Sequence, residues 1–321
     1  MVSGLVSCES LVTNIPASKL PKGTEKIVLH AYISPQDTIV LVKVTKSNPV
    51  FGTFSNNGFG FSVIGKDTVF YTGGAIENAK VTLSNSKKQS AQLAYDKREG
   101  VYLITTKNFP IVAGETYTLT AEAAQGKAEA SCTVPMDVVK IKSYSIDTVT
   151  IKQFEYVRTE AHILFEWDDV KGMTNYYTMK ASVQTELLIP ESKGGGQVVY
   201  VQRKPIYDAN WDDANGHEEY QSDVNTDGTS FMTPKGVIYL NSGIYNINGK
   251  QYFSQLVGRG FVATLELLNV DKNYYSYHRS VRTNSRQDNN PFVEPVPLYS
   301  NVTGGLGCFA ASNKFILKVD F

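Results

Sequence analysis

The end of the chain carries the sequence feature that most constrains the fold. Residues 290–309 contain three prolines and then three closely spaced glycines: Pro291, Pro295, Pro297, Gly304, Gly305 and Gly307. Proline removes a backbone donor and holds the chain extended, whereas glycine permits a sharp turn that a side chain would block. The alternating apolar run of residues 315–321 that follows is typical of a strand. We therefore expect the chain to close as a sheet strand after an extended segment and a turn.

This closing motif resembles that of domain-of-unknown-function family 4249, a group of Bacteroidota cell-envelope lipoproteins. The residues that carry the resemblance are Asn290, Pro291, Phe292, Glu294, Pro295, Asn301, Gly304, Gly305, Gly307 and Phe309. The resemblance extends from residue 27 to residue 321 and is weakest over residues 48–72 and 204–234. The resemblance implies a location in the cell envelope and the fold of this family. It implies no substrate and no catalytic residue.

The first residues of the chain agree with a location in the cell envelope. Leu5, Val6, Ser7 and Cys8 stand in an order that resembles a lipobox, in which a signal peptidase cuts before a cysteine that carries a lipid. A complete signal also has a basic region and an apolar stretch of roughly 7 to 15 residues. Residues 1–24 are therefore expected to be a truncated lipoprotein signal, lipidated at Cys8, and a tether. The alternative is an ordinary disordered start with a lone cysteine.

Composition limits the classes of partner. The chain has 321 residues, of which 42% are hydrophobic and 19% are charged, and 31 basic residues balance 31 acidic ones. This length allows two hydrophobic cores. A zero net charge gives no electrostatic reason to bind a polyanion, so we expect no nucleic-acid partner. No apolar run approaches the roughly 18 residues of a spanning helix, so the lipid on Cys8 is the expected attachment to the membrane.

The rhythm of short β-branched runs predicts a mainly β protein with two domains. About seven such runs between residues 25 and 135 favour an immunoglobulin-like β-sandwich, which also resembles the small sandwich modules of carboxypeptidase-regulatory type. Pro135 marks the predicted boundary. Residues 136–321 are expected to form a larger domain of β-sandwich or barrel-like type, with one principal helix.

Two segments of the second domain depart from the strand rhythm. Asp271 is a candidate N-cap for a helix near residues 272–285, which has one apolar face at helical spacing. Residues 204–234 are polar and acidic and show almost no apolar periodicity. We therefore expect that segment to be a long surface loop.

The search for catalytic motifs is mostly negative. No nucleophile elbow, phosphate-binding glycine loop or paired metal-ligand histidine occurs in the sequence. His30 lies in an apolar run and is expected to be a hydrogen-bonded core residue. Cys132 and Cys308 lie in strand-like runs of different domains, so we expect two buried, unpaired thiols, although an oxidising compartment also permits a disulfide.

One segment has the spacing with which a calcium loop begins. Asp223, Asn225 and Asp227 offer oxygen-bearing side chains at alternate positions, and Gly228 permits the tight turn that follows. The bidentate carboxylate expected at the twelfth loop position is missing, because Pro234 stands there. The segment is a candidate calcium site that needs further oxygen ligands. The alternative is a plain turn rich in Asp and Asn, and no other cofactor is expected.

Aromatic residues in two irregular segments suggest contact surfaces. Residues 51–61 carry four phenylalanines around a candidate hairpin turn, and Trp211 lies in the acidic segment. We expect Phe54, Phe59 and Trp211 to contact a partner or a ligand. The alternative is that the phenylalanine rings pack on the first sandwich.

Together these observations predict a non-enzymatic outer-membrane lipoprotein at the cell surface, or otherwise on the periplasmic face. The family resemblance implies a TonB-dependent transporter barrel as its partner, beside which it would act as an accessory or ligand-binding subunit. The first alternative is a structural subunit of an outer-membrane assembly, which a second domain without an aromatic-lined cleft would favour. A hydrolase is less expected, because the acidic pairs after Trp167 and Trp211 are adjacent on turns and adjacent acids usually point apart.

Overall fold

The computed structural model describes nine stretches of the chain, which are residues 24–47, 60–64, 67–71, 74–153, 156–212, 218–240, 243–257, 260–287 and 297–321. Several residues singled out above lie outside this part of the chain. They are Cys8, Phe54, Phe59, Asn290, Pro291, Phe292, Glu294 and Pro295.

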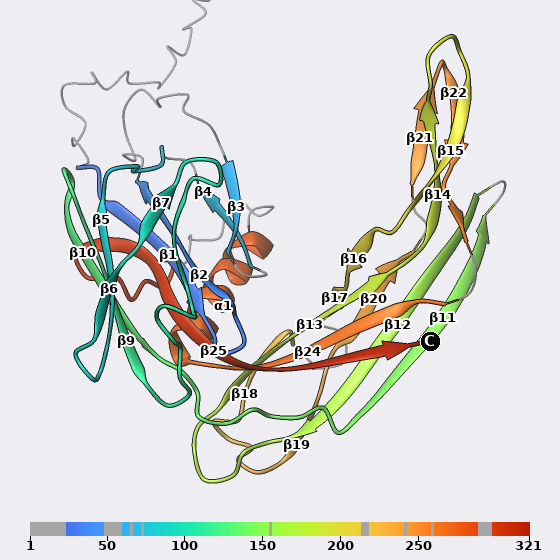
Figure 1. Ribbon diagram of the computed structural model, residues 1–321. Coiled ribbons are helices and arrows are strands. Elements are labelled where there is room, and N and C mark those ends of the chain that lie inside the picture. Colours follow the sequence, from blue (N-terminus) through green and yellow to red (C-terminus); the bar gives the residue numbers. More distant parts are fainter. Residues whose placement is uncertain are drawn as a thin grey trace, which may run out of the picture.

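Strands dominate the described residues, which confirms the mainly β prediction. The largest sheet extends through the whole molecule (Figure 1). In spatial order its strands are β16 (Ile206–Asp208), β13 (Tyr176–Gln184), β24 (Val262–Val270), β25 (Gly305–Asp320), β1 (Ile27–Ile33), β2 (Ile39–Lys46), β8 (Val101–Thr105) and β7 (Ala94–Asp96), with β18 (Tyr220–Ser222) also on β13.

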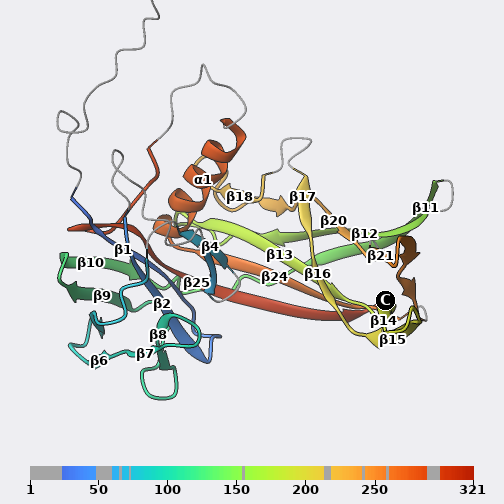
Figure 2. The same ribbon diagram turned by 90° about the horizontal axis from the view of Figure 1, so that it is seen from above.

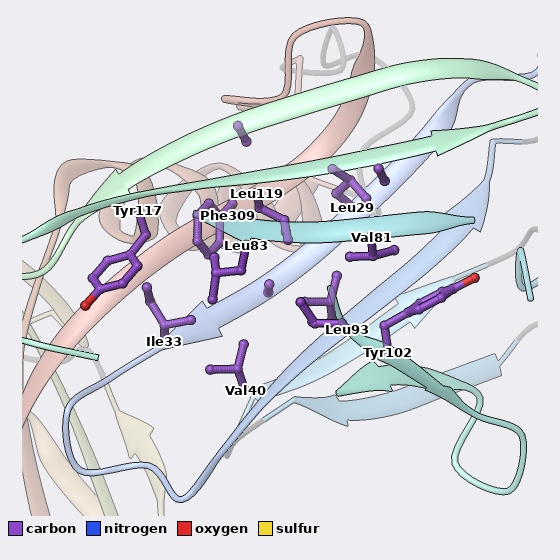
Figure 3. Packing of buried hydrophobic residues seen from close by; sticks show 14 of the residues in the cluster. Leu29, Ile33, Val40, Val81, Leu83, Leu93, Tyr102, Tyr117, Leu119 and Phe309 are labelled. Atoms are coloured by element: carbon purple, nitrogen blue, oxygen red, sulfur yellow. The ribbon is translucent and has the colours of Figure 1, made fainter. Parts of the chain in front are cut away.

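A second sheet covers the N-terminal part of the large sheet and completes a sandwich. Its strands in spatial order are β10 (Gly126–Thr133), β9 (Thr116–Ala123), β5 (Lys80–Asn85) and β6 (Ser90–Gln92). Leu29 from the large sheet and Leu83 and Leu119 from the second sheet belong to one hydrophobic cluster, and all three side chains are fully buried (Figure 3). The described residues of this part also include the hairpin of β3 (Gly60–Ile64) and β4 (Asp67–Tyr71).

Strand β25 joins the two halves of the molecule. Residues 305–311 pair in parallel with β1, and residues 312–320 pair antiparallel with β24. Phe309 consequently lies in the same buried cluster as Leu29 (Figure 3). The domain boundary at Pro135 stays a prediction. The pairing of β25 with β1 shows that the C-terminal end of residues 136–321 returns to complete the first sandwich.

The second half has its own core between two layers. The large sheet there faces a sheet made of β11 (Ser143–Gln153), β12 (Tyr156–Asp168), β20 (Lys235–Tyr239) and β17 (Asn210–Asp212), with β19 (Ser230–Met232) also on β12. Trp167, Tyr177 and Leu265 are fully buried between these layers. Beyond them, a projecting end is built from β14 (Leu187–Ser192), β15 (Val198–Arg203), β21 (Ile244–Ile247), β22 (Lys250–Phe253) and β23 (Gln255–Leu256) (Figures 1 and 2).

The predicted helix is confirmed as α1 (Lys272–Gln287). Asp271 caps it, because its Oδ1 accepts a hydrogen bond from the backbone N–H of Tyr274 at 2.8 Å. The helix packs on β25, β13 and β18 through a face that includes the fully buried Tyr274. No helix in the described part of the chain combines the length and the apolar character that a membrane span requires.

The prediction of a long surface loop over residues 204–234 is wrong. The described residues of this segment contain four short strands, β16, β17, β18 and β19. Each strand has only three residues, which is too short for an alternating pattern to show in the sequence. Their positions are set by pairing with the long strands β12 and β13 and with β20.

Candidate functional site

The described residues line a cleft of about 860 Å³ beside α1, where β18 contacts the helix and β19 also contributes to the lining. Figure 2 shows α1 lying next to β18. Helix α1 contributes Lys272, Tyr275 and Arg279 to the lining. The opposite side comes from residues 218–232, with Glu166 of β12 and Tyr176 of β13 completing the site.

Four aromatic side chains line the cleft: Tyr176, Tyr220, Tyr275 and Phe231. Each ring is held by a neighbouring ring. Tyr176 and Tyr275 contact each other with centroids 4.8 Å apart, Tyr220 stacks on His278 at 5.7 Å, and Phe231 stacks on Trp167 at 5.8 Å. These contacts fix the orientation of the rings, which can therefore present apolar faces to a ligand without first becoming ordered.

Charged groups of both signs accompany the rings. The Arg279 guanidinium carbon lies 5.6 Å from the centroid of the Tyr275 ring, and its Nη2 lies 3.8 Å from Oε2 of Glu218. Glu166 accepts a hydrogen bond from the Ser143 hydroxyl at 3.1 Å. Lys272, the first residue of α1, adds a second positive charge to the lining of the cleft. The arrangement suits a polar ligand that also has an apolar face.

Three carboxylates converge beside the wall of this cleft. Oxygen atoms of Asp169, Asp223 and Asp227 all lie within 4.8 Å of one another. Asp169 follows the end of β12, and the other two belong to the turn of residues 223–229 after β18. A backbone hydrogen bond of 2.7 Å from the N–H of Thr226 to the carbonyl of Asp223 closes this turn.

The three carboxylates differ in their surroundings. Asp169 accepts hydrogen bonds from the Tyr177 hydroxyl at 2.6 Å and from the backbone N–H of Gly228 at 2.7 Å, and Asp227 accepts one from the backbone N–H of Gly172 at 2.8 Å. Asp223 is only 2% exposed, and neither of its carboxylate oxygens has a hydrogen-bond partner. Burial, together with the nearby carboxylates, raises the pKa of Asp223 above its ordinary value.

The structure places the two aspartates of the predicted calcium segment in this acidic cluster. Asn225 lies between them in the same turn and is exposed. The role of Asn225 as a ligand stays a prediction. Sequence reasoning missed Asp169, which joins the cluster because β12 pairs with β19 and thereby carries the end of β12 to the turn.

Trp211 does not line the cleft. Its ring packs at a centroid distance of 6.1 Å from Phe165 and lies against Gly236, where an added Cβ would come within 2.7 Å of the indole. The ring is partly buried against the core of the second half, and its expected contact with a partner or a ligand stays a prediction.

The described residues of the closing motif build the fold rather than the cleft. The Asn301 side chain accepts a hydrogen bond from the backbone N–H of Phe309 at 3.0 Å and donates one to its carbonyl at 2.7 Å. Gly304 adopts a φ of 72° in the turn before β25, and Gly307 adopts a φ of 110° inside the strand. The motif therefore sets the course of β25 where it enters the sandwich.

Two predictions about buried polar residues agree with the structure. Cys132 and Cys308 are both buried and form no disulfide bond. His30 is 5% exposed, and its Nε2 lies 2.8 Å from the hydroxyl of Tyr277 on α1. Neither feature belongs to the cleft.

The fold and the cleft thus define a mainly β protein with a ring-lined groove beside a single described helix. The chain belongs to the family described as Domain of unknown function (DUF4249), which matches residues 9–315. This match confirms the family that the closing motif resembles. No curated protein matches the chain.

Proposed function

We propose that this protein is a non-enzymatic, lipid-anchored outer-membrane protein that captures a ligand in its cleft and serves a TonB-dependent transporter as an accessory subunit. The observation that carries the proposal is the aromatic lining of the cleft. The anchor and the transporter are carried over from the sequence of the N-terminus and from the family resemblance.

The dimensions and the lining of the cleft support ligand capture. Its volume of about 860 Å³ falls within the range of roughly 300–1,000 Å³ that is usual for small-molecule sites. Rings that already contact their neighbours lose little freedom when a ligand stacks on them. A purely structural subunit would be favoured by a second domain without an aromatic-lined cleft. Because aromatic rings do line this cleft, ligand capture is favoured over that alternative.

The chemistry of the lining supports a binding role rather than catalysis. No histidine or cysteine lines the cleft within the described residues. Its two carboxylates are engaged, since Glu166 accepts a hydrogen bond from Ser143 and Glu218 lies beside Arg279. A binding protein for a polar solute needs only these groups, which orient the solute while the rings cover its apolar face.

Native mass spectrometry of the protein isolated from its own envelope extract tests ligand capture. The wild-type protein should carry a small-molecule adduct that dissociates on activation, and the Tyr220→Ala, Tyr275→Ala double variant should lose it because two rings are removed. Tyr200→Ala is the matched control, since this tyrosine is 42% exposed on β15 and lies outside the cleft. An adduct that survives in the double variant, or its absence from the wild-type protein, contradicts the proposal.

A further inference from the structure

The spacing of the acidic cluster matches the geometry of a single bound ion. Oxygen ligands surround Ca²⁺ at about 2.3–2.6 Å, so two oxygens on one ion lie at most about 5 Å apart. The oxygens of Asp169, Asp223 and Asp227 satisfy this limit, because all lie within 4.8 Å of one another. Carboxylate oxygens are hard ligands, which favour Ca²⁺ or Mg²⁺ over zinc and copper.

The buried carboxylate of Asp223 is an independent observation that points to a ligand. Its side chain is removed from solvent, with 2% of the residue exposed, and both oxygens lack a hydrogen-bond partner. An ionised carboxylate in such a place is strongly unfavourable unless a cation or donors compensate it. None of the ion pairs between described residues involves this aspartate or its two acidic neighbours.

The surrounding hydrogen bonds hold the other two carboxylates in place. The Tyr177 hydroxyl and the Gly228 N–H position Asp169, and the Gly172 N–H positions Asp227. Outer partners of this kind are what orient the ligands of metal sites. Each hydrogen-bonded oxygen keeps a lone pair that is free for an ion.

We propose that Asp169, Asp223 and Asp227 bind Ca²⁺ and that the ion fixes the turn of residues 223–229 against the end of β12. This turn supplies Val224, Asn225, Thr226 and Thr229 to the lining of the cleft. Calcium binding therefore stiffens one wall of the ligand site. The inference concerns the cation alone, and it holds whether or not a transporter or a solute binds.

Calcium titration of the full chain tests this inference. After removal of metal with EGTA, added CaCl₂ should release or absorb heat in isothermal titration calorimetry with one site per chain, and it should raise the melting temperature. Asp169→Asn and Asp223→Asn should each abolish both signals. Asp168→Asn is the matched control, because this exposed neighbour bonds to Lys142 and Ser230 instead and should leave the calcium response unchanged.

Two further measurements distinguish loss of the calcium site from loss of the fold. In EGTA, Asp223→Asn should melt at or above the temperature of the wild-type protein, since the substitution removes an uncompensated buried charge while keeping the shape. If that variant fails to fold, displacement of Tb³⁺ emission by Ca²⁺ in the wild-type protein supplies the same answer. Equal melting in Ca²⁺ and EGTA with no heat of binding overturns the proposal, and a response to Mg²⁺ alone overturns the assignment to calcium.

Discussion

At the scale of single residues, two glycines of the closing motif act through the space that they leave beside neighbouring strands, Gly307 beside β1 and Gly304 beside β10. A Cβ on Gly307 would lie 2.0 Å from the carbonyl oxygen of Leu29, and one on Gly304 would lie 2.3 Å from the carbonyl oxygen of Lys127. Both obstacles are backbone atoms, so no rotation of a side chain relieves them. The two positions also have positive φ, which favours glycine in any case.

Gly307→Ala is expected to lower the free energy of unfolding by roughly 3 kcal/mol or more, because it adds a clash in the sheet to backbone strain. Denaturant unfolding followed by circular dichroism measures this change. Gly126→Ala is the control, since this glycine has a φ of 121° but nothing within 4 Å of an added Cβ, so only strain is introduced. Equal destabilisation by both substitutions contradicts the clash.

His30 provides a prediction for pH dependence. Burial, and then the charge of His278, lower the pKa of His30 from 6.5 to about 4. Between these values the unfolded chain binds a proton that the folded chain does not bind, so stability falls as the pH drops from 6.5 towards 4. Asp271 acts in the opposite direction, because burial raises its pKa to about 7.

Comparison with His30→Gln isolates this effect, because glutamine does not titrate and Asp271 is common to both proteins. The wild-type protein should lose about 3 kcal/mol more than the variant between pH 7 and pH 4, as measured by urea unfolding. Parallel pH profiles of the two proteins would show that His30 is not held neutral by the fold.

At the scale of elements, a helix or strand could be predicted from the sequence when the residues that determine it lie close together in the chain. Helix α1 was predicted because its cap, Asp271, and its apolar face lie within one segment. The three-residue strands were missed because their positions depend on pairing with distant partners. The cluster shows both cases: Asp223 and Asp227 share one turn, whereas Asp169 is brought in by the pairing of β12 with β19. The cleft was unpredictable in detail, since α1 and β18 meet only in the folded chain.

Asn301 tests the connection between two elements, the segment before β25 and the strand itself. Its side chain bonds to both main-chain groups of Phe309 and also donates to the carbonyl of Ser131 in β10 at 3.1 Å. Asn301→Ala should lower the free energy of unfolding by about 2 kcal/mol, because it leaves these groups without their partner. Asn246→Ala in the exposed hairpin is the control. A denaturation midpoint equal to that of the wild-type protein would show that the hydrogen bonds of the Asn301 side chain do not contribute to stability.

At the scale of the whole molecule, β25 makes one body of the two halves (Figure 1). Asn313, in the middle of this strand, donates hydrogen bonds to the carbonyls of Pro135 and Met136, where the chain passes between the halves. The cleft lies beside α1, which packs on the same strand. A ligand site and a long connecting strand are therefore part of one continuous structure.

The proposed anchor gives a prediction at this scale. Cys8→Ala should move the full-length protein from the membrane fraction to the soluble fraction, because a thioether-linked lipid is then absent. Immunoblotting of fractionated cells measures the distribution, and Cys132→Ala, at a buried thiol, is the control. A variant that still requires detergent for extraction argues against a lipid on Cys8.

Copurification from detergent-solubilised outer membranes tests the central claim most directly. The full chain, tagged at its C-terminus and chemically crosslinked in intact cells, should retain a TonB-dependent transporter barrel that mass spectrometry identifies. The account predicts crosslinks between that barrel and this chain in the wild-type protein. Recovery of the chain with no transporter of that class, at a yield sufficient to detect one, would contradict the role of an accessory subunit.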